Sequence, residues 1–283
     1  MKRLQHRNKL MPKPVRVLDK WFEVENNFFL ELEVNSCYSV PGQFIQVGLA
    51  GVGEAPISIA SHGDTLLLNI NIVGKVTRML SKVKPHEYVL VRGPLGKGYP
   101  LQSLKGNNLV LIGGGCGVAP LAAVLDYVCK NRQDFESVKC FFGFKSPDQV
   151  IFKKQIKRWA EIANINISVD KDLKLKQELK QLQGIERFIN FEGFVTQALE
   201  QSFLTNNNIV AFICGPPIMM KHAVKVLKSK GFKDEQIFLS MERLMYCGIG
   251  YCCHCMINDL YTCIDGPVFR LDVLRSRPES GFE

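Results

Sequence analysis

A group of cysteines near the end of the sequence constrains this chain more than any other feature. Five of its ten cysteines fall within the 17 residues from Cys247 to Cys263. Four of them, Cys247, Cys252, Cys255 and Cys263, have the spacing C-x4-C-x2-C-x7-C. Thiolates are strong metal ligands, and short regular spacings of this kind are typical of metal-binding loops. We therefore expect this segment to fold around a metal centre.

The spacing favours an iron–sulfur cluster over a structural zinc ion. C-x4-C-x2-C is the ferredoxin-like pattern for a [2Fe–2S] cluster, in which a tight loop wraps one side and a later cysteine closes the other. Gly248 and Gly250 lie where that loop must approach inorganic sulfide, because a residue without Cβ lets backbone N–H groups come close. Zinc ribbons usually supply two C-x2-C pairs instead. Cys253 could in principle replace its neighbour Cys252, although the spacing favours Cys252.

Length and composition predict two domains with a small appendage. The chain has 283 residues, 46% of them hydrophobic, so it can bury substantial cores. We find no apolar region typical of a signal peptide and no run that could span a membrane. The five cysteines outside the cluster segment are scattered without a disulfide framework, which is typical of a reducing cytoplasm. We therefore expect a cytoplasmic protein without a membrane partner.

The net charge of +9 favours an acidic redox partner or nucleotide phosphates as ligands. A solvated, lysine-rich face is the simpler explanation for part of this charge. No RNA-binding or DNA-binding motif accompanies it, so we expect no nucleic-acid partner.

The first hundred residues predict an antiparallel β-barrel. Short runs rich in β-branched and aromatic residues alternate with turn signals such as Pro41-Gly42 and His62-Gly63. The predicted strands are residues 15–24, 28–34, 44–49, 57–61, 65–73 and 88–92.

Near Asn107 the pattern changes to that of a nucleotide-binding α/β domain. A buried strand leads into a glycine turn, and apolar residues then recur at helical spacing from Leu121 to Val128. Glycines let the main chain approach a pyrophosphate at a helix N-terminus. The candidate nucleotide-binding residues in this turn are Gly113, Gly114, Gly115 and Gly117.

Further strands are predicted at 138–144, 165–169 and 209–214, separated by helical stretches. The last strand ends at Cys214 and continues into Gly215 and Pro216, ahead of another helical pattern. The carboxyl ends of parallel strands line the ligand crevice of an open α/β sheet, so Cys214 is a candidate to contact a nicotinamide. A plain buried thiol is an equally good interpretation.

Over nearly its whole length the sequence resembles the ferredoxin–NADP reductase superfamily. The similar segments are Pro41-Gly-Gln-Phe, Gly53-Glu-Ala-Pro-Ile-Ser58, Val73-Gly-Lys-Val-Thr77, Gly93-Pro-Leu-Gly96, the turn at 113–120 and Cys214-Gly-Pro-Pro. The resemblance is to the branch with a [2Fe–2S] tail, which includes sulfhydrogenase gamma subunits and the electron-transfer subunits of dihydroorotate dehydrogenase and of anaerobic sulfite reductase. Within that branch, Val52–Ser58, Gly98–Pro100, Gly215–Met219, Glu242-Arg243 and Tyr261–Phe269 resemble the sulfite reductase subunit most.

This resemblance implies a ferredoxin reductase-like fold of three parts. They are an FAD-binding antiparallel β-barrel at 1–104, an NAD(P)-binding α/β domain with a parallel sheet at 105–233, and a small [2Fe–2S] tail at 234–283. The implied flavin-binding residues are Pro56, Ile57, Ser58, Val73, Gly74, Lys75, Val76 and Thr77; loop capping is the alternative role for Thr77. Ala55 stands where many members have an arginine that contacts the flavin phosphate.

The implied function is an oxidoreductase subunit that oxidises NADH and passes electrons through FAD and the cluster to a catalytic partner. NADH gives two electrons as hydride, whereas the cluster accepts one at a time, and a flavin can do both. The segment Gly143-Phe-Lys-Ser146 lacks a clear arginine pair for a 2′-phosphate, which favours NADH over NADPH.

The expected partners are a catalytic sulfite reductase subunit and a ferredoxin-like iron–sulfur subunit. This chain has no second set of four cysteines for a sirohaem centre, so another subunit must reduce sulfite. One alternative keeps the chemistry and makes dihydroorotate dehydrogenase or a hydrogenase the partner. An alternative of a different class is a zinc-stabilised nucleotide-binding regulatory module.

Overall fold

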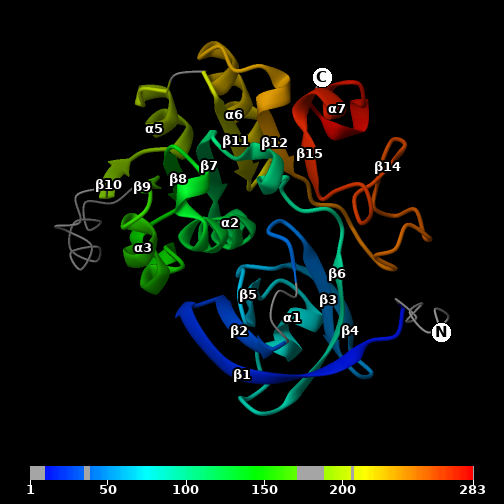
Figure 1. Ribbon diagram of the computed structural model, residues 1–283. Helices are drawn as coiled ribbons and strands as arrows, with labels where there is room; N and C mark the ends of the chain where they lie inside the picture. The colour runs from blue at the N-terminus through cyan, green and yellow to red at the C-terminus, as the bar shows by residue number, and fades with distance from the viewer. Residues whose placement is uncertain (1–9, 35–38, 171–187, 205–206, 283) are drawn as a thin grey trace.

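The computed structural model describes residues 10–34, 39–170, 188–204 and 207–282. An antiparallel barrel comes first in the chain, and a parallel α/β layer follows it (Figure 1). The C-terminal segment then crosses back, so that its loops contact the barrel while its last strand joins the parallel sheet.

The barrel is a six-stranded antiparallel sheet in the order β4-β3-β6-β1-β2-β5. Its elements are β1 (Lys13–Val24), β2 (Asn27–Glu33), β3 (Phe44–Leu49), β4 (Gly53–Ser58), β5 (Thr65–Asn71), α1 (Lys75–Leu80) and β6 (Tyr88–Leu95). A bridge between Ile59 and Leu68 joins the two ends of the sheet. Alternate apolar residues of the strands point inward, and Val17, Phe28, Leu30, Ile45 and Val89 are fully buried there.

The second sheet has seven strands in the order β10-β9-β8-β7-β11-β12-β15. The strands are β7 (Asn108–Gly114), β8 (Val138–Phe144), β9 (Asn164–Val169), β10 (Phe188–Glu192), β11 (Ile209–Cys214), β12 (Ile237–Ser240) and β15 (Val268–Arg270). All neighbours are parallel except β15, which pairs antiparallel with β12. The order reverses between β7 and β11, which makes the crevice between them the switch point where such sheets bind ligands.

Helices cover both faces of this sheet, as its almost wholly apolar strands require. The helices are α2 (Val118–Lys130), α3 (Lys153–Ala160), α5 (Val195–Gln201), α6 (Pro217–Ser229) and α7 (Leu271–Arg275). Leu109 and Leu111 of β7 pack in the core that contains α2 and α3, whereas Val110 and Ile112 pack in the core that contains α5, α6 and α7. The alternation of side chains along β7 thus assigns one core to each face.

The predicted fold class is confirmed, because a barrel, a parallel α/β sheet and a C-terminal tail are all present. The helical spacings are also correct, since the apolar residues predicted on α2 and α6 are buried. The prediction of a strand at 57–61 was shifted: β4 begins at Gly53, because it pairs in full register with β3. Proline fits at position 56 because β4 is an edge strand. The N–H that proline lacks would point away from β3, so no hydrogen bond of the sheet is lost.

The division at residues 104 and 233 stays a prediction. Two strands of the predicted tail, β12 and β15, belong to the seven-stranded sheet of the preceding segment. Within the described part of the tail, only the short hairpin β13 (Met256–Ile257) and β14 (Leu260–Tyr261) forms a sheet of its own. No helix in the described ranges is long and apolar enough to cross a membrane.

Candidate redox site

A cavity of about 750 Å³ opens at the carboxyl ends of the parallel strands, where the barrel meets the sheet. The sheet contributes the residues that follow β7, β8, β9 and β11, and the barrel contributes two asparagines. Its polar and turn residues include Gly114, Gly115, Lys145, Asp170, Pro216, His222, Asn27 and Asn71. This is the switch point of the sheet, and its size suits a nucleotide.

The four glycines of the predicted nucleotide turn have different surroundings. A Cβ on Gly114 would collide with the side chain of Met219, and a Cβ on Gly117 would collide with the backbone atoms of Cys214 and Gly215. A Cβ on Gly113 would lie 3.0–3.1 Å from neighbouring side chains, which is a tight contact. Gly115 has a positive φ of 53° and nothing within 4 Å of a Cβ. Gly114 and Gly117 therefore allow the turn to pack against β11 and α6, Gly113 packs against α2 and β8, and Gly115 faces open space in the cavity.

Cys214 is a buried thiol rather than a lining residue of the cavity. It is 3% exposed, and burial raises the pKa of its thiol to about 12. Pro216 lines the cavity two residues later, while Gly215 allows the close approach of Gly114. The structure thus favours the simpler interpretation of Cys214.

The candidate flavin residues lie on β4 and α1, which the fold brings into contact. Gly53 at the start of β4 approaches the side chain of Val76 in α1. Pro56 is exposed and Ser58 half-buried on the edge strand, and Val73 is 82% exposed ahead of the helix. An open strand edge beside an exposed turn fits a flat ring system followed by a diphosphate.

Thr77 caps the turn that precedes α1. Its Oγ1 accepts hydrogen bonds from the backbone N–H groups of Val73 and Gly74 at 3.0 and 3.1 Å. The residue is only 5% exposed. The structure therefore favours loop capping for Thr77, which fixes the shape of the turn formed by Val73 and Gly74.

The four predicted cluster ligands are brought together by two loops. Backbone N–H groups of Ile249, Tyr251 and Cys252 lie 3.3–3.5 Å from Cys247 Sγ. Gly250 N donates to Cys263 Sγ at 3.1 Å. Gly248 and Gly250 both have positive φ, of 72° and 73°, so the tight loop depends on glycine. Such N–H···S contacts stabilise thiolates bound to a cluster.

The four candidate ligands fall into two pairs. Cys255 Sγ and Cys263 Sγ are 3.3 Å apart, and Cys252 is bonded through its N–H to Cys247 Sγ. A [2Fe–2S] cluster is held by four thiolates, two on each iron, so two pairs of cysteines suit it. In the ranges that the structure describes, no three His, Cys, Asp or Glu side chains are arranged to hold one metal ion.

Cys252 and its neighbour Cys253 have different environments. Backbone hydrogen bonds with Cys247 and then His254 lower the pKa of the Cys252 thiol to about 7. Cys253 is exposed with a positive φ of 62°, and its Sγ lies 3.6 Å from the Tyr261 hydroxyl. Burial raises the pKa of Cys263 to about 12, so that ligand needs a metal to ionise it. These observations favour Cys252 as the ligand.

The barrel forms one wall of the cysteine site. Phe44 of β3 and Leu95 of β6 pack with Cys255 and Cys263 in a small apolar core. Gln46 is 1% exposed, and its amide nitrogen has no hydrogen-bond partner among the described residues although it lies beside Gly248 of the loop. A buried donor without a partner fits a site that an acceptor group completes.

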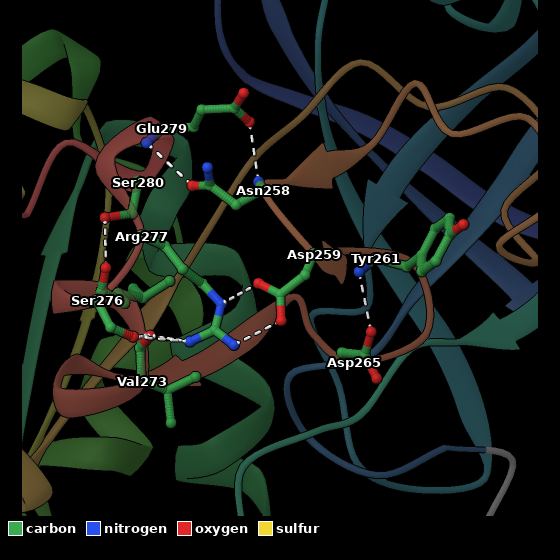
Figure 2. A network of polar contacts seen from close by, with 10 residues as sticks. Asn258, Asp259, Tyr261, Asp265, Val273, Ser276, Arg277, Glu279 and Ser280 are labelled. Carbon is green, nitrogen blue, oxygen red and sulfur yellow. Dashed lines mark hydrogen bonds and ion pairs between the residues drawn. The ribbon is translucent and has the colours of Figure 1, made fainter.

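The hairpin between Cys255 and Cys263 is held by the C-terminal turns (Figure 2). Arg277 forms two hydrogen bonds with Asp259 at 2.6 and 2.8 Å. Asn258 N donates to the Glu279 carboxylate at 2.9 Å, and Glu279 N donates back to the Asn258 amide oxygen at 3.1 Å. Because this hairpin sets the separation of two candidate ligands, the end of the chain supports the candidate metal site.

Sequence patterns did not reveal several residues of these sites. Asn27 and Asn71 reach the cavity from the barrel, and Arg92 reaches the cysteine loop from β6. Each lies far along the chain from the residues it meets, so local spacing carried no signal for them. Glu54 lay inside the flavin-like motif, but its ion pair with Arg92 depends on strand pairing.

Comparison with known proteins places this geometry in a family. Residues 111–225 match the model of the oxidoreductase NAD-binding domain. Residues 242–275 match the iron–sulfur cluster binding domain of dihydroorotate dehydrogenase B. The second match contains all four candidate cluster ligands.

Among curated proteins, the gamma subunit of sulfhydrogenase 2 from Pyrococcus furiosus is 32% identical, covering 98% of this chain and 94% of the relative. The probable electron transfer subunit of dihydroorotate dehydrogenase B from Thermoplasma acidophilum is 30% identical, covering 85% and 82%. The chain belongs to this family of electron-transfer subunits. Like its relatives, it is an NAD(H)-dependent oxidoreductase subunit.

Solved structures support the fold of this electron-transfer subunit. An NADH-dependent reduced ferredoxin–NADP oxidoreductase matches with a TM-score of 0.72 at 23% identity, covering 93% of this chain and 92% of the other. A ferredoxin–NADP⁺ reductase from Neisseria gonorrhoeae matches with a TM-score of 0.63 at 20% identity, covering 81% and 98%. With the two matched domains, the ferredoxin reductase-like fold supports FAD, NADH and an iron–sulfur cluster as cofactors.

We predict that serine in place of Cys247, Cys252, Cys255 or Cys263 removes the cluster and leaves most of the flavin bound. Cys253→Ser is the matched control and should retain the cluster, since its side chain is exposed. Iron, acid-labile sulfide and visible absorption measure the outcome. Stoichiometric zinc without sulfide in the anaerobically purified wild type would contradict the prediction. Loss of the cluster in Cys253→Ser but not in Cys252→Ser would reverse the choice between these neighbours.

We predict that Gly115→Val weakens NADH binding without releasing flavin. The added side chain enters the cavity, so the KM for NADH should rise by about tenfold or more, the factor for 1.4 kcal/mol. Gly106→Val is the control, because Gly106 also has a positive φ and open space but lies outside the cavity. Stopped-flow measurement of flavin reduction at several NADH concentrations gives the change in NADH binding. Flavin loss from folded Gly115→Val would mean that the two sites are exchanged.

We predict that Arg277→Ala loosens the hairpin and speeds loss of the cluster to a chelator. An ion pair with one exposed partner contributes about 1 kcal/mol or less, which corresponds to roughly fivefold in the rate. Arg270→Ala is the control, because Arg270 forms a similar pair with Asp272 that does not touch the hairpin. Equal rates of cluster loss in the two variants would show that the C-terminal turns do not support the site.

Proposed function

We propose that this chain oxidises NADH and passes the electrons through FAD and a [2Fe–2S] cluster to a separate catalytic subunit. The observation that carries the proposal is the direct connection between the candidate flavin strand and the cysteine loop. Arg92 is bonded both to Glu54 of the candidate flavin strand and to the carbonyl oxygen of Cys247 in the cysteine loop. FAD, when bound, accepts a hydride and releases electrons singly, which links NADH to a one-electron cluster.

In this proposal each part of the chain has one task. Residues 1–104 bind FAD through β4 and the turn before α1, and residues 105–233 bind the pyridine nucleotide in the cavity beside Gly115 and Pro216. Residues 234–283 bind the cluster through Cys247, Cys252, Cys255 and Cys263. NADH is favoured over NADPH by the sequence after β8.

We propose a sulfite reductase as the partner, with a catalytic subunit and a ferredoxin-like iron–sulfur subunit. The support comes from the segments Val52–Ser58, Gly215–Met219 and Tyr261–Phe269, which resemble the electron-transfer subunit of anaerobic sulfite reductase. Once four cysteines are assigned to the cluster, no second set is spaced for a sirohaem centre. Sulfite reduction would therefore take place on another subunit.

A hydrogenase is the second candidate partner, because two sulfhydrogenase gamma subunits of Pyrococcus furiosus are 32% and 35% identical to this chain. Both candidates use the same input of electrons from NADH. They differ only in the subunit that receives electrons from the cluster.

We predict that the isolated protein reduces artificial dyes with NADH but leaves sulfite untouched. Sulfite-dependent oxidation of NADH should appear only when the partner subunits are added, and an anaerobic assay of NADH absorbance follows it. Sulfite turnover by the single chain would contradict the argument that its cysteines cannot hold a sirohaem centre. Turnover of hydrogen or dihydroorotate by the isolated native complex would assign the corresponding partner instead. A purified wild type without flavin and cluster absorption would refute the relay itself.

A further inference from the structure

Arg92 joins the candidate flavin strand to the first cluster ligand through a single buried side chain. It lies on β6, between the barrel core and the cysteine loop, and is 5% exposed. Its Nε lies 3.0 Å from both carboxylate oxygens of Glu54, and its Nη2 lies 2.6 Å from Oε2. On its other side, Nη1 donates to the Cys247 carbonyl at 2.7 Å and Nη2 to the Tyr246 carbonyl at 3.2 Å.

The position of this guanidinium follows from strand pairing. Arg92 pairs with Gln46 of β3, and Gln46 pairs in turn with Pro56 of β4. The three strands therefore present Arg92 next to the segment that begins with Glu54. A planar fork of fixed geometry can bond to a carboxylate and two carbonyls together, which the point charge of a lysine cannot do.

The surroundings make the charges of Arg92 and Glu54 important to a cluster. Leu95, Phe44 and the cysteines form an apolar core beside the loop, and the Arg92 side chain is only 4% exposed. The charge of Arg92 is therefore weakly screened, and that of Glu54, which is 27% exposed, is screened in part. The potential of an iron–sulfur cluster depends on local charge and on hydrogen bonds near its ligands.

We propose that Arg92 is a positioning residue for electron transfer, which holds the Cys247 loop at a fixed place relative to β4 and, with Glu54, sets the cluster potential. This inference rests on the proposed function, because it assumes that Cys247 binds the cluster and β4 the flavin. It predicts a coupling between the two sites that a purely local role in barrel stability would not produce.

The test compares Arg92→Gln, Arg92→Lys and Glu54→Gln in the holoprotein. Redox titration followed by EPR gives the cluster potential, and stopped-flow spectroscopy separates flavin reduction by NADH from cluster reduction. Lys97→Gln is the control, since it removes one positive charge near the same loop from a side chain that is 68% exposed.

We expect the two single changes of charge to shift the cluster potential in opposite directions. Arg92→Gln removes a positive charge and should lower the potential, while Glu54→Gln leaves that charge uncompensated and should raise it. A shift of about 59 mV corresponds to tenfold in a one-electron equilibrium, and we expect shifts of this order. Lys97→Gln should leave the potential unchanged, because solvent screens that charge.

Arg92→Lys separates position from charge. It should keep the potential near that of the wild type but slow cluster reduction by about tenfold, because the loop loses its bidentate anchor. Flavin reduction by NADH is timed in the same experiment, so that a slower input of electrons is distinguished from slower transfer to the cluster. If Arg92→Gln does not fold, Glu54→Gln and Arg92→Lys still decide the question.

Equal potentials in Arg92→Gln, Glu54→Gln and the wild type would overturn the inference, as would shifts in the same direction. Unchanged cluster reduction in Arg92→Lys would overturn the positioning role. These outcomes differ from failure of the proposed function, which would appear in the wild type as a missing cluster or as a cluster that NADH cannot reduce.

Discussion

The antiparallel pairing of β12 with β15 fixes the arrangement of the sites. Ser240 pairs with Val268 and Met241 N donates to the Pro267 carbonyl, so both ends of the segment 241–267 are held at the edge of the parallel sheet. The middle of that segment carries all four candidate ligands and rests on the barrel. Closing the long loop in this way costs conformational entropy, which strand pairing, hairpin contacts and a bound metal centre can offset.

The contact between the loop and the barrel is polar at its centre and apolar around it. A buried charge such as that of Arg92 is costly unless hydrogen bonds satisfy its donors. Here the guanidinium of Arg92 satisfies this condition by bonding to Glu54 and to two loop carbonyls. Phe44 and Leu95 pack with Cys255 and Cys263 in an apolar core on the same wall of the barrel. The geometry thus favours one position of the loop over many that an apolar surface alone would allow.

At the nucleotide site, close backbone packing and an open cavity are produced by the same short turn. Gly117 allows the turn to touch the end of β11, and Gly114 allows the approach of Met219 from α6. Gly115, between them, faces the cavity. The turn is therefore rigid because its neighbours pack tightly, and it is accessible because one residue has no side chain.

Local patterns were enough to predict both fold classes, most strands of the two sheets and the motif of four cysteines. Strand alternation, the helical spacing of α2 and α6, and cysteine spacing each depend on residues close together in the chain. The contacts within and between the sites depend on the tertiary structure. Local spacing cannot show that Arg92 contacts Cys247, that Arg277 holds the hairpin between two ligands, or that Cys214 is enclosed. Each of these contacts depends on which distant surfaces pack together, and that packing is a property of the whole chain rather than of any one segment.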